Sequence, residues 1–180
     1  MKTRSILCSF LFLFVVMTAR AQMTHGSHSE VGPTKAIAVL NPTKGSSVSG
    51  AVTFEKTDKG VRVVAKISGL TSGRHGFHIH EYGDCSADNG ISAGGHFNPG
   101  GMPHSGPMME KRHVGDMGNL EADKDGNASL DYVDPMITLT GPHAVIGYGV
   151  IVHEKEDDLK SQPTGDAGGR LACGVIGVAR

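Results

Sequence analysis

The sequence predicts an all-β domain, an antiparallel sandwich or barrel whose long loops carry the function. Short runs rich in valine and isoleucine recur from residue 35 onward, and no segment shows a sustained helical period. The composition, with 26 glycines and no tryptophan, favours many turns between short strands.

Eight runs are expected to be strands, at residues 36–40, 48–54, 61–67, 76–80, 128–133, 136–139, 145–152 and 171–178. Several alternate between apolar and polar residues, as in VRVVAKI at 61–67, which places the apolar groups on one face of a sheet. Two long loops are expected, from 81 to about 127 and from 154 to 170. Loops of this length in a compact domain are usually functional or disordered.

The first residues predict an export signal. Lys2 and Arg4 precede an apolar run at 6–17, and a small-residue cleavage site ends at Ala21. A membrane anchor or a buried helix is the alternative, but about a dozen apolar residues are too few to span a bilayer. We expect a signal peptide at 1–21, a flexible histidine-containing lead-in at 22–34 and one folded domain at 35–180.

Charge and cysteine usage restrict the functional classes. Removal of residues 1–21 takes away three basic residues and no acidic one, which changes the formal net charge from −1 to −4. An acidic protein of this kind is a poor ligand for nucleic acid and other polyanions. Cys8 is lost with the signal, and the remaining Cys85 and Cys173 predict a disulfide in an exported protein.

Histidines gather at the boundaries of the predicted loops. His78 and His80 stand two residues apart in a predicted strand, so both imidazoles project from the same face. Taken alone, this pair is equally consistent with a solvated strand face or an ordinary hydrogen-bonded pair. His153 ends another predicted strand, which is able to bring it back beside the pair.

A second group of possible metal donors follows in the first loop and comprises His96, His104, His113 and Asp116. Three imidazoles and one carboxylate form a four-coordinate zinc set. Coordination by nitrogen alone suits copper, but imidazole also binds zinc and nickel, so ligand type leaves the metal open. Two four-coordinate metals need one more bond than the seven donors supply singly. One imidazole must therefore bridge them, and His96 is the natural candidate.

Five segments occur in a characteristic order: GFHIHEYGDC at 76–85, GGHFNP at 94–99, RHVGDMGN at 112–119, VIVHEKEDDL at 150–159 and GDAGGRLACGVIG at 165–177. Together they resemble the copper/zinc superoxide dismutase family, and the resemblance covers essentially all of residues 35–180. It implies superoxide dismutation by an exported enzyme, periplasmic or secreted. It also implies an eight-stranded antiparallel Greek-key barrel or sandwich with two long functional loops, an architecture for which this family is itself a standard example.

The resemblance implies roles for individual residues. Copper, one per subunit, is expected on His78, His80, His96 and His153, and zinc, one per subunit, on His96, His104, His113 and Asp116. Asp157 would link His78 to His104, the alternative being a solvated charge beside Asp158. Arg170 would attract the superoxide anion, the alternative being a surface salt bridge. His96 would also carry a proton during turnover.

Further positions follow from the same resemblance. Cys85 and Cys173 match the family disulfide. Cys85 directly follows Gly83-Asp84, as in bacterial members, instead of lying nearer His96, as in cytosolic eukaryotic members. Residues 146–148 and 174–179 resemble the surface that forms a homodimer. Other histidines are expected to have no metal role (His75, His143) or to be incidental more often than metal-binding (His25, His28). Asn127 begins a glycosylation sequon.

The loop at 154–170 departs most from the family. It is several residues shorter than in eukaryotic members, and Pro163 stands where those members carry a lysine before the matching threonine. Weaker electrostatic guidance of the substrate is expected.

Two other functions are considered for the same residues. One is a copper/zinc carrier without turnover, against which Arg170 argues. The other is a zinc hydrolase, which needs an open zinc position.

Overall fold

The computed structural model describes residues 32–180, which form an all-β domain, as predicted. The strands are β1 (Lys35–Pro42), β2 (Ser49–Thr57), β3 (Gly60–Ser68), β4 (Gly73–His80), β5 (Asp116–Ala122), β6 (Ala128–Asp134), β7 (Gly149–His153), β8 (Arg170–Val175) and β9 (Gly177–Val178). One 3₁₀ turn, η1 (Ile91–Ala93), lies in the loop after β4. No helix of the described residues is long and apolar enough to cross a membrane. The predicted signal peptide and most of the predicted lead-in lie outside these residues.

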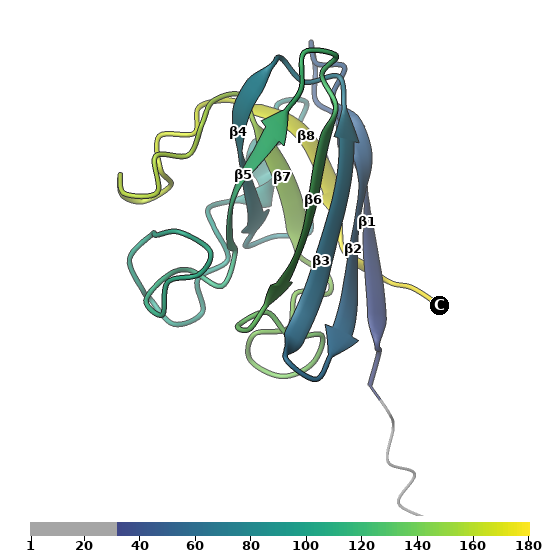
Figure 1. Ribbon diagram of the computed structural model, residues 1–180, viewed down its shortest axis with the longest axis vertical. Helices are drawn as coiled ribbons and strands as arrows, with labels where there is room; N and C mark the ends of the chain where they lie inside the picture. Colours follow the sequence, from purple (N-terminus) through teal and green to yellow (C-terminus); the bar gives the residue numbers. More distant parts are fainter. Residues whose placement is uncertain (1–31) are drawn as a thin grey trace, which may run out of the picture. The chain divides into compact units, whose positions relative to one another are not determined.

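The strands form one antiparallel sheet that closes on itself. The order is β2-β3-β6-β5-β4-β7-β8-β1-β9, and β1 also pairs with β2, so β1 to β8 make a closed barrel. Because β3 pairs with β6 and β4 with β7, the connections between non-consecutive strands follow a Greek-key path. The long loops after β4 and β7 extend on the left of Figure 1, away from β1, β2 and β3. Closure leaves no free sheet edge between the barrel strands.

Alternation along the strands builds the core. In β3, Val61, Val63, Ala65 and Ile67 are buried, whereas the residues between them are exposed or half-buried. The same period of two places alternate residues of β1 inside. Each fully buried valine or isoleucine contributes roughly 1.5–3 kcal/mol through the hydrophobic effect. The barrel interior is therefore a packed apolar core, and the site lies outside it.

One predicted strand is absent and another was missed. The run at 136–139 is a loop in which Thr138 makes only an isolated bridge to Ala144, although Ile137 and Leu139 are buried. These residues are apolar because they cover one end of the core. β5 falls inside the predicted first loop, since its sequence DMGNLEA has no β-branched residue and no clean alternation. The predicted strand at 145–152 shortens to β7, and the run at 171–178 divides into β8 and β9.

The second half of β4, like the whole of β7, is buried on both faces. Residues 75–80 are all buried, with core on one side and the long loops on the other. Its pairing with β5 shifts register between Gly76 and His78. A Cβ on Gly76 would lie 2.8 Å from the Ala167 Cβ and 3.1 Å from the His78 Cε1, so glycine allows the loop after β7 to approach. β4 is thus the strand on which the loops pack.

Two ties hold the loop after β4 against the barrel. Cys85 and Cys173 form a disulfide with a Cα–Cα distance of 5.7 Å that joins this loop to β8. The buried Arg112 guanidinium donates to Asp134 Oδ1 (2.6 Å) at the end of β6, and its other terminal nitrogen donates to three main-chain carbonyls of residues 113, 114 and 116. This buried charge is therefore paired and hydrogen-bonded, as burial requires.

We predict that replacing both cysteines, as Cys85→Ser with Cys173→Ala, lowers the free energy of unfolding by about 4 kcal/mol, because the bond closes a loop with a sequence separation of 88 residues. Urea denaturation of the metal-free protein measures the loss. Thiol reductant should destabilise the wild type but leave the double variant unchanged. Two free thiols in protein purified in air would contradict the prediction.

Candidate metal centre

Two buried clusters of possible metal ligands lie side by side. One contains His78, His80, His96 and His153, and the other contains His96, His104, His113 and Asp116. In each cluster the candidate ligand atoms all lie within 4.8 Å of one another. The donors come from β4, the middle and the last part of the loop that follows it, the start of β5 and the end of β7. All the donors expected from the sequence are thus brought together, and His96 belongs to both clusters.

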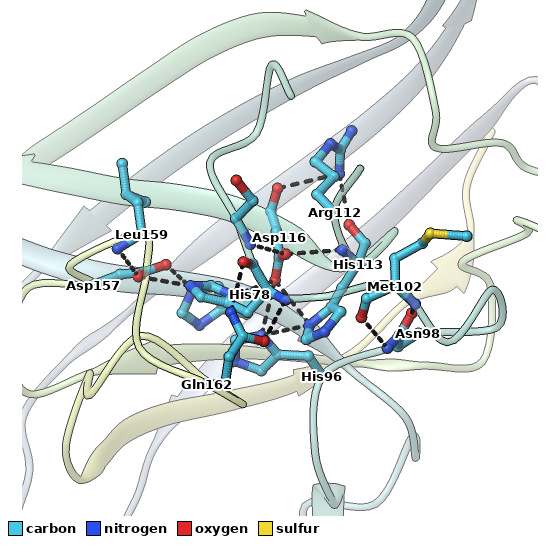
Figure 2. A network of polar contacts seen from close by, with 12 residues as sticks. His78, His96, Asn98, Met102, Arg112, His113, Asp116, Asp157, Leu159 and Gln162 are labelled. Carbon is cyan, nitrogen blue, oxygen red and sulfur yellow. Dashed lines mark hydrogen bonds and ion pairs between the residues drawn. The ribbon is translucent and has the colours of Figure 1, made fainter. Parts of the chain in front are cut away.

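The second cluster converges on one carboxylate oxygen. Asp116 Oδ1 lies 2.9 Å from Nδ1 of His96, 2.9 Å from Nδ1 of His104 and 3.2 Å from Nδ1 of His113. Asp116 Oδ2 is held separately by the main-chain N–H groups of Ser105 (3.1 Å) and His113 (2.9 Å). Figure 2 shows the His96, His113 and Asp116 side chains pointing toward one another. Three nitrogens and one oxygen around a common point match a closed four-coordinate zinc set.

The first cluster contains nitrogens whose lone pairs lack a proton donor. The Nδ1–H of His80 donates to the Gly94 carbonyl (2.9 Å), and that of His153 faces the Gly168 carbonyl (3.3 Å). These bonds leave both Nε2 atoms unprotonated, yet they lie 3.2 Å apart. Two facing lone pairs in a buried site repel unless a cation lies between them. The arrangement therefore fits a bound metal ion.

Two more nitrogens support the same fit. His78 Nδ1 and His96 Nε2 are buried and have no hydrogen-bond partner within residues 32–180. Their rings are fixed from the other side, because His78 Nε2 bonds Asp157 Oδ2 (2.7 Å) and His96 Nδ1 bonds Asp116. Buried polar atoms without partners are rare, and a metal ion would satisfy both. The residues present thus fit two metals that share His96.

Burial keeps the imidazoles of the first cluster neutral. Loss of hydration disfavours the imidazolium form, which lowers the pKa of His96 to about 4 and holds the pKa values of His80 and His153 well below the ordinary value. The pKa of His78 is lowered for the same reason, although Asp157 opposes the shift. Neutral imidazole is the form that binds a metal.

The carboxylates behave differently. Burial disfavours the charged form of Asp116, but hydrogen bonds from His104, His113 and His96 outweigh burial and lower its pKa. The pKa of Asp157 is lowered in the same way by His104 and His78. Burial also opposes the charged form of His104, yet its hydrogen bonds to the two carboxylates raise its pKa to about 9. A metal that binds Nδ1 of His104 must therefore displace a proton.

Asp157 connects the two clusters. Its Oδ2 atom bonds His78 Nε2 (2.7 Å), and its Oδ1 atom lies 2.9 Å from His104 Nε2. Asp157 is fully buried, so the alternative of a solvated charge is wrong. Asn119 in β5 fixes its main chain, accepting from the Asp157 N–H (2.8 Å) and donating to its carbonyl (2.9 Å). Sequence reasoning missed Asn119, although it ends the quoted segment RHVGDMGN.

Arg170 lies beside the first cluster and is held by main-chain carbonyls. Its Nη1 donates to Gly90 (2.6 Å) and its Nη2 to Gly94 (2.5 Å), the carbonyl that also accepts from His80. Among the described residues it forms no ion pair, so the surface salt bridge is not what holds it. Its position thus depends on the loop that the disulfide ties to β8.

The remaining residues named from the sequence lie away from the clusters. The Nδ1 atom of His75 lies 2.9 Å from the His153 carbonyl, and its Nε2 atom faces the hydroxyl (3.2 Å) and the carbonyl (2.9 Å) of Thr71. His143 bonds the Met136 carbonyl (3.2 Å). Asn127 is exposed in the turn between β5 and β6. His25 and His28 lie outside the described residues.

Comparison with known proteins agrees with this geometry. A family model described as copper/zinc superoxide dismutase matches residues 48–176. The extracellular superoxide dismutase [Cu-Zn] of Drosophila melanogaster is 47% identical over 179 aligned positions, which cover 93% of this chain and 98% of that protein. The crystal structure of the clock protein EA4 is similar with a TM-score of 0.77 and 44% identity, covering 84% of this chain and 99% of that one. The chain therefore belongs to the copper/zinc superoxide dismutase family.

Proposed function

We propose that this protein is an exported superoxide dismutase that uses one copper and one zinc ion per subunit. The observation that carries the proposal is the sharing of His96 between two buried donor clusters, each with atoms positioned for a cation. Membership of the family supplies the reaction, the conversion of superoxide to oxygen and hydrogen peroxide.

The ligand sets distinguish the two metals. The all-nitrogen set, His78, His80, His96 and His153, suits copper, and the set with one carboxylate, His96, His104, His113 and Asp116, suits zinc. His96 belongs to both sets, so its imidazole would serve both metals when they are bound. Copper, when bound, supplies the one-electron chemistry that oxidises one superoxide and reduces another.

The protein's own groups bind the substrate and supply a proton. Superoxide is a small monoanion, and the Arg170 guanidinium keeps donors free for it after its two bonds to main-chain carbonyls. His96 Nε2 has no other partner within the described residues and is the candidate atom for holding the proton that the second superoxide takes up. Asp157 keeps the ring of His78 in place by accepting its Nε2–H.

Two other functions were considered for the same residues. A copper/zinc carrier needs the ligands but no anion-binding group, and Arg170 beside the all-nitrogen cluster argues against it. A zinc hydrolase needs an open zinc position and a general base. The proposed zinc set is already complete with four protein ligands, which disfavours hydrolysis.

Reconstitution with copper and zinc tests the function and the bridge together. We expect the dialysed and reloaded protein to remove superoxide in a cytochrome reduction assay. His96→Ala should lose both metals and the activity, because its imidazole serves both sites, whereas His104→Ala should lose zinc and keep a copper spectrum. Metal analysis and absorption spectra measure the outcome. Full occupancy of both sites in His96→Ala would contradict the bridging role, and a loaded wild type without turnover would indicate a carrier.

Export is proposed from the N-terminal sequence and the disulfide. Residues 1–21 would be removed as a signal peptide, 22–34 would remain as a lead-in, and 35–180 would form the enzyme. A disulfide persists in oxidising compartments, which the periplasm and the extracellular space both provide. The relative from Drosophila melanogaster is named an extracellular enzyme, in agreement with a site outside the cytoplasm.

A homodimer is proposed from an exposed apolar patch. Val39 of β1, Tyr82 after β4, Val175 of β8 and Val178 of β9 are 43–64% exposed. Val39 and Val175 line one surface hollow, and a Cβ on Gly83, next to Tyr82 in the chain, would lie 3.1 Å from Val175 Cγ1. Val178 lies in β9, which pairs with β1. Exposed apolar side chains on neighbouring strands favour a self-complementary two-fold contact.

The dimer proposal predicts that Val178→Arg shifts the protein from twice the subunit mass to the monomer mass, because a charge introduced into an apolar contact loses its hydration. Light scattering after gel filtration measures the mass. Val133→Arg, on the exposed side of β6, is the matched control and should stay dimeric. A monomeric wild type at micromolar concentration would refute the dimer.

The short loop between β7 and β8 predicts a shallow fall of rate with ionic strength. Few cations focus the field on this acidic protein, so guidance depends mainly on Arg170 and the metals. The Debye length falls from about 30 Å at 0.01 M to about 10 Å at 0.1 M salt. The salt slope, measured by pulse radiolysis, should nearly vanish in Arg170→Ala and steepen in Pro163→Lys. Arg62→Ala, which removes a cation paired with Asp131, should leave it unchanged. An unaltered slope in Arg170→Ala would contradict this.

A further inference from the structure

Gln162, in the loop between β7 and β8, forms hydrogen bonds with both main-chain groups of His104, a proposed zinc ligand. Its Oε1 atom accepts a hydrogen bond from the His104 N–H (2.8 Å), and its Nε2 atom donates to the His104 carbonyl (2.9 Å). Figure 2 shows the Gln162 side chain reaching into the network of ligands. The same reciprocal pattern joins Asn119 to Asp157. Each end of the hydrogen bond between Asp157 and His104 is thus held by one side-chain amide.

The loop holds Gln162 in the orientation that this contact needs. The Asp158 carboxylate accepts from the main-chain N–H groups of Lys160 (2.9 Å) and Ser161 (2.8 Å), which fixes the turn before Gln162. The Gly165 N–H donates to the Ser161 carbonyl (2.7 Å) and closes the turn after it. Gln162 Nε2 also donates to the Lys160 carbonyl (3.0 Å). Little side-chain freedom remains to be lost on contact with His104.

The same turn approaches the imidazole of His104 from a second side. Gly165 has a φ of +69°, and a Cβ at this position would lie 1.9 Å from Asp157 Oδ1 and 2.7 Å from His104 Nε2. Its main chain therefore covers the hydrogen bond between Asp157 and His104. The segment from Gln162 to Gly165 contacts His104 at its main chain and beside its ring. A displacement of this segment would therefore release both the main chain and the ring of His104.

We propose that Gln162 is a positioning residue for the zinc site, which keeps His104 oriented and couples zinc binding to the order of the loop at 154–169. The proposal depends on the assignment of His104 to zinc made above. Without Gln162, the main chain of His104 loses both of its hydrogen bonds to this loop, and only the contacts beside its ring remain. Zinc should then leave faster. By reciprocity of linked equilibria, zinc should order the loop less effectively.

The experiment measures zinc release from the copper- and zinc-loaded enzyme to the chelator 4-(2-pyridylazo)resorcinol. Gln162→Ala should release zinc about tenfold faster, in the range found when partners of metal ligands are removed. Gln162→Glu keeps an oxygen that accepts from the His104 N–H but loses the donor, so an intermediate rate is expected. Ser161→Ala is the matched control, because it removes a hydrogen bond within the loop to Asp158 but none to His104.

Hydrogen exchange supplies the readout that general destabilisation would not reproduce. The His104 amide should lose protection in Gln162→Ala but not in Ser161→Ala, and zinc should protect residues 158–165 less in Gln162→Ala than in the wild type. Gln162→Ala is able to fold and still fail to load zinc. Unchanged exchange of the β3 amides then shows that the barrel is intact, and the exchange rate of the His104 amide in the metal-free protein tests the positioning role.

The proposal is overturned by wild-type zinc release and His104 exchange in Gln162→Ala, or by equal acceleration in Ser161→Ala. His104→Ala separates this failure from failure of the proposed function. Zinc loss in His104→Ala with none in Gln162→Ala refutes the positioning role alone. Retention of zinc in His104→Ala refutes the zinc assignment itself.

Discussion

The structure depends on the way His96 presents two ring nitrogens to two buried donor clusters. Seven side chains converge there, and four nitrogens of the first cluster have no proton to share among them. Such a cluster is unfavourable in a buried site unless cations occupy it. Burial keeps these imidazoles neutral, which is the form that binds a metal, but their lone pairs then face one another without a positive partner. The folded protein is thus matched to two cations and not to an apolar packing of the same residues.

The barrel places only part of the site, and the loops supply the rest. β4 and β7 carry three of the four all-nitrogen ligands, whereas His104 and His113 come from a loop without a sheet ladder to fix it. That loop is held by the disulfide, by the buried Arg112–Asp134 pair and by the contacts of Asp157 with His104. Each tie joins loop to strand or loop to loop over a long sequence separation. Rigid ligand geometry in a loop therefore requires several independent attachments.

The Arg170 guanidinium lies beside the first cluster, where an anionic substrate would need a positive partner. Arg170 belongs to β8, is held by two glycine carbonyls and shares one of them with His80. This arrangement sets the guanidinium against the first cluster while leaving donors free. Attraction of superoxide is a standard example of electrostatic steering in this family. In the function proposed above, local capture by Arg170 would contribute more than the long-range field of an acidic protein.

Sequence alone predicted the fold class and the seven donors that the structure gathers into two clusters. Strand alternation gives a period of two wherever one face is buried, and five segments in a characteristic order identified the donors through their resemblance to the family. It could not locate β5, whose residues lack β propensity and are held by pairing with β4 and β6, nor the loop at 136–139, whose apolar side chains cap the core. Asn119, Arg112 and Gln162 were also hidden, because their partners are main-chain groups and a carboxylate brought near only by folding. Ligand identity is a chemical property carried by single residues, whereas the orientation of each ligand depends on contacts between segments far apart in sequence, and only the tertiary structure decides those.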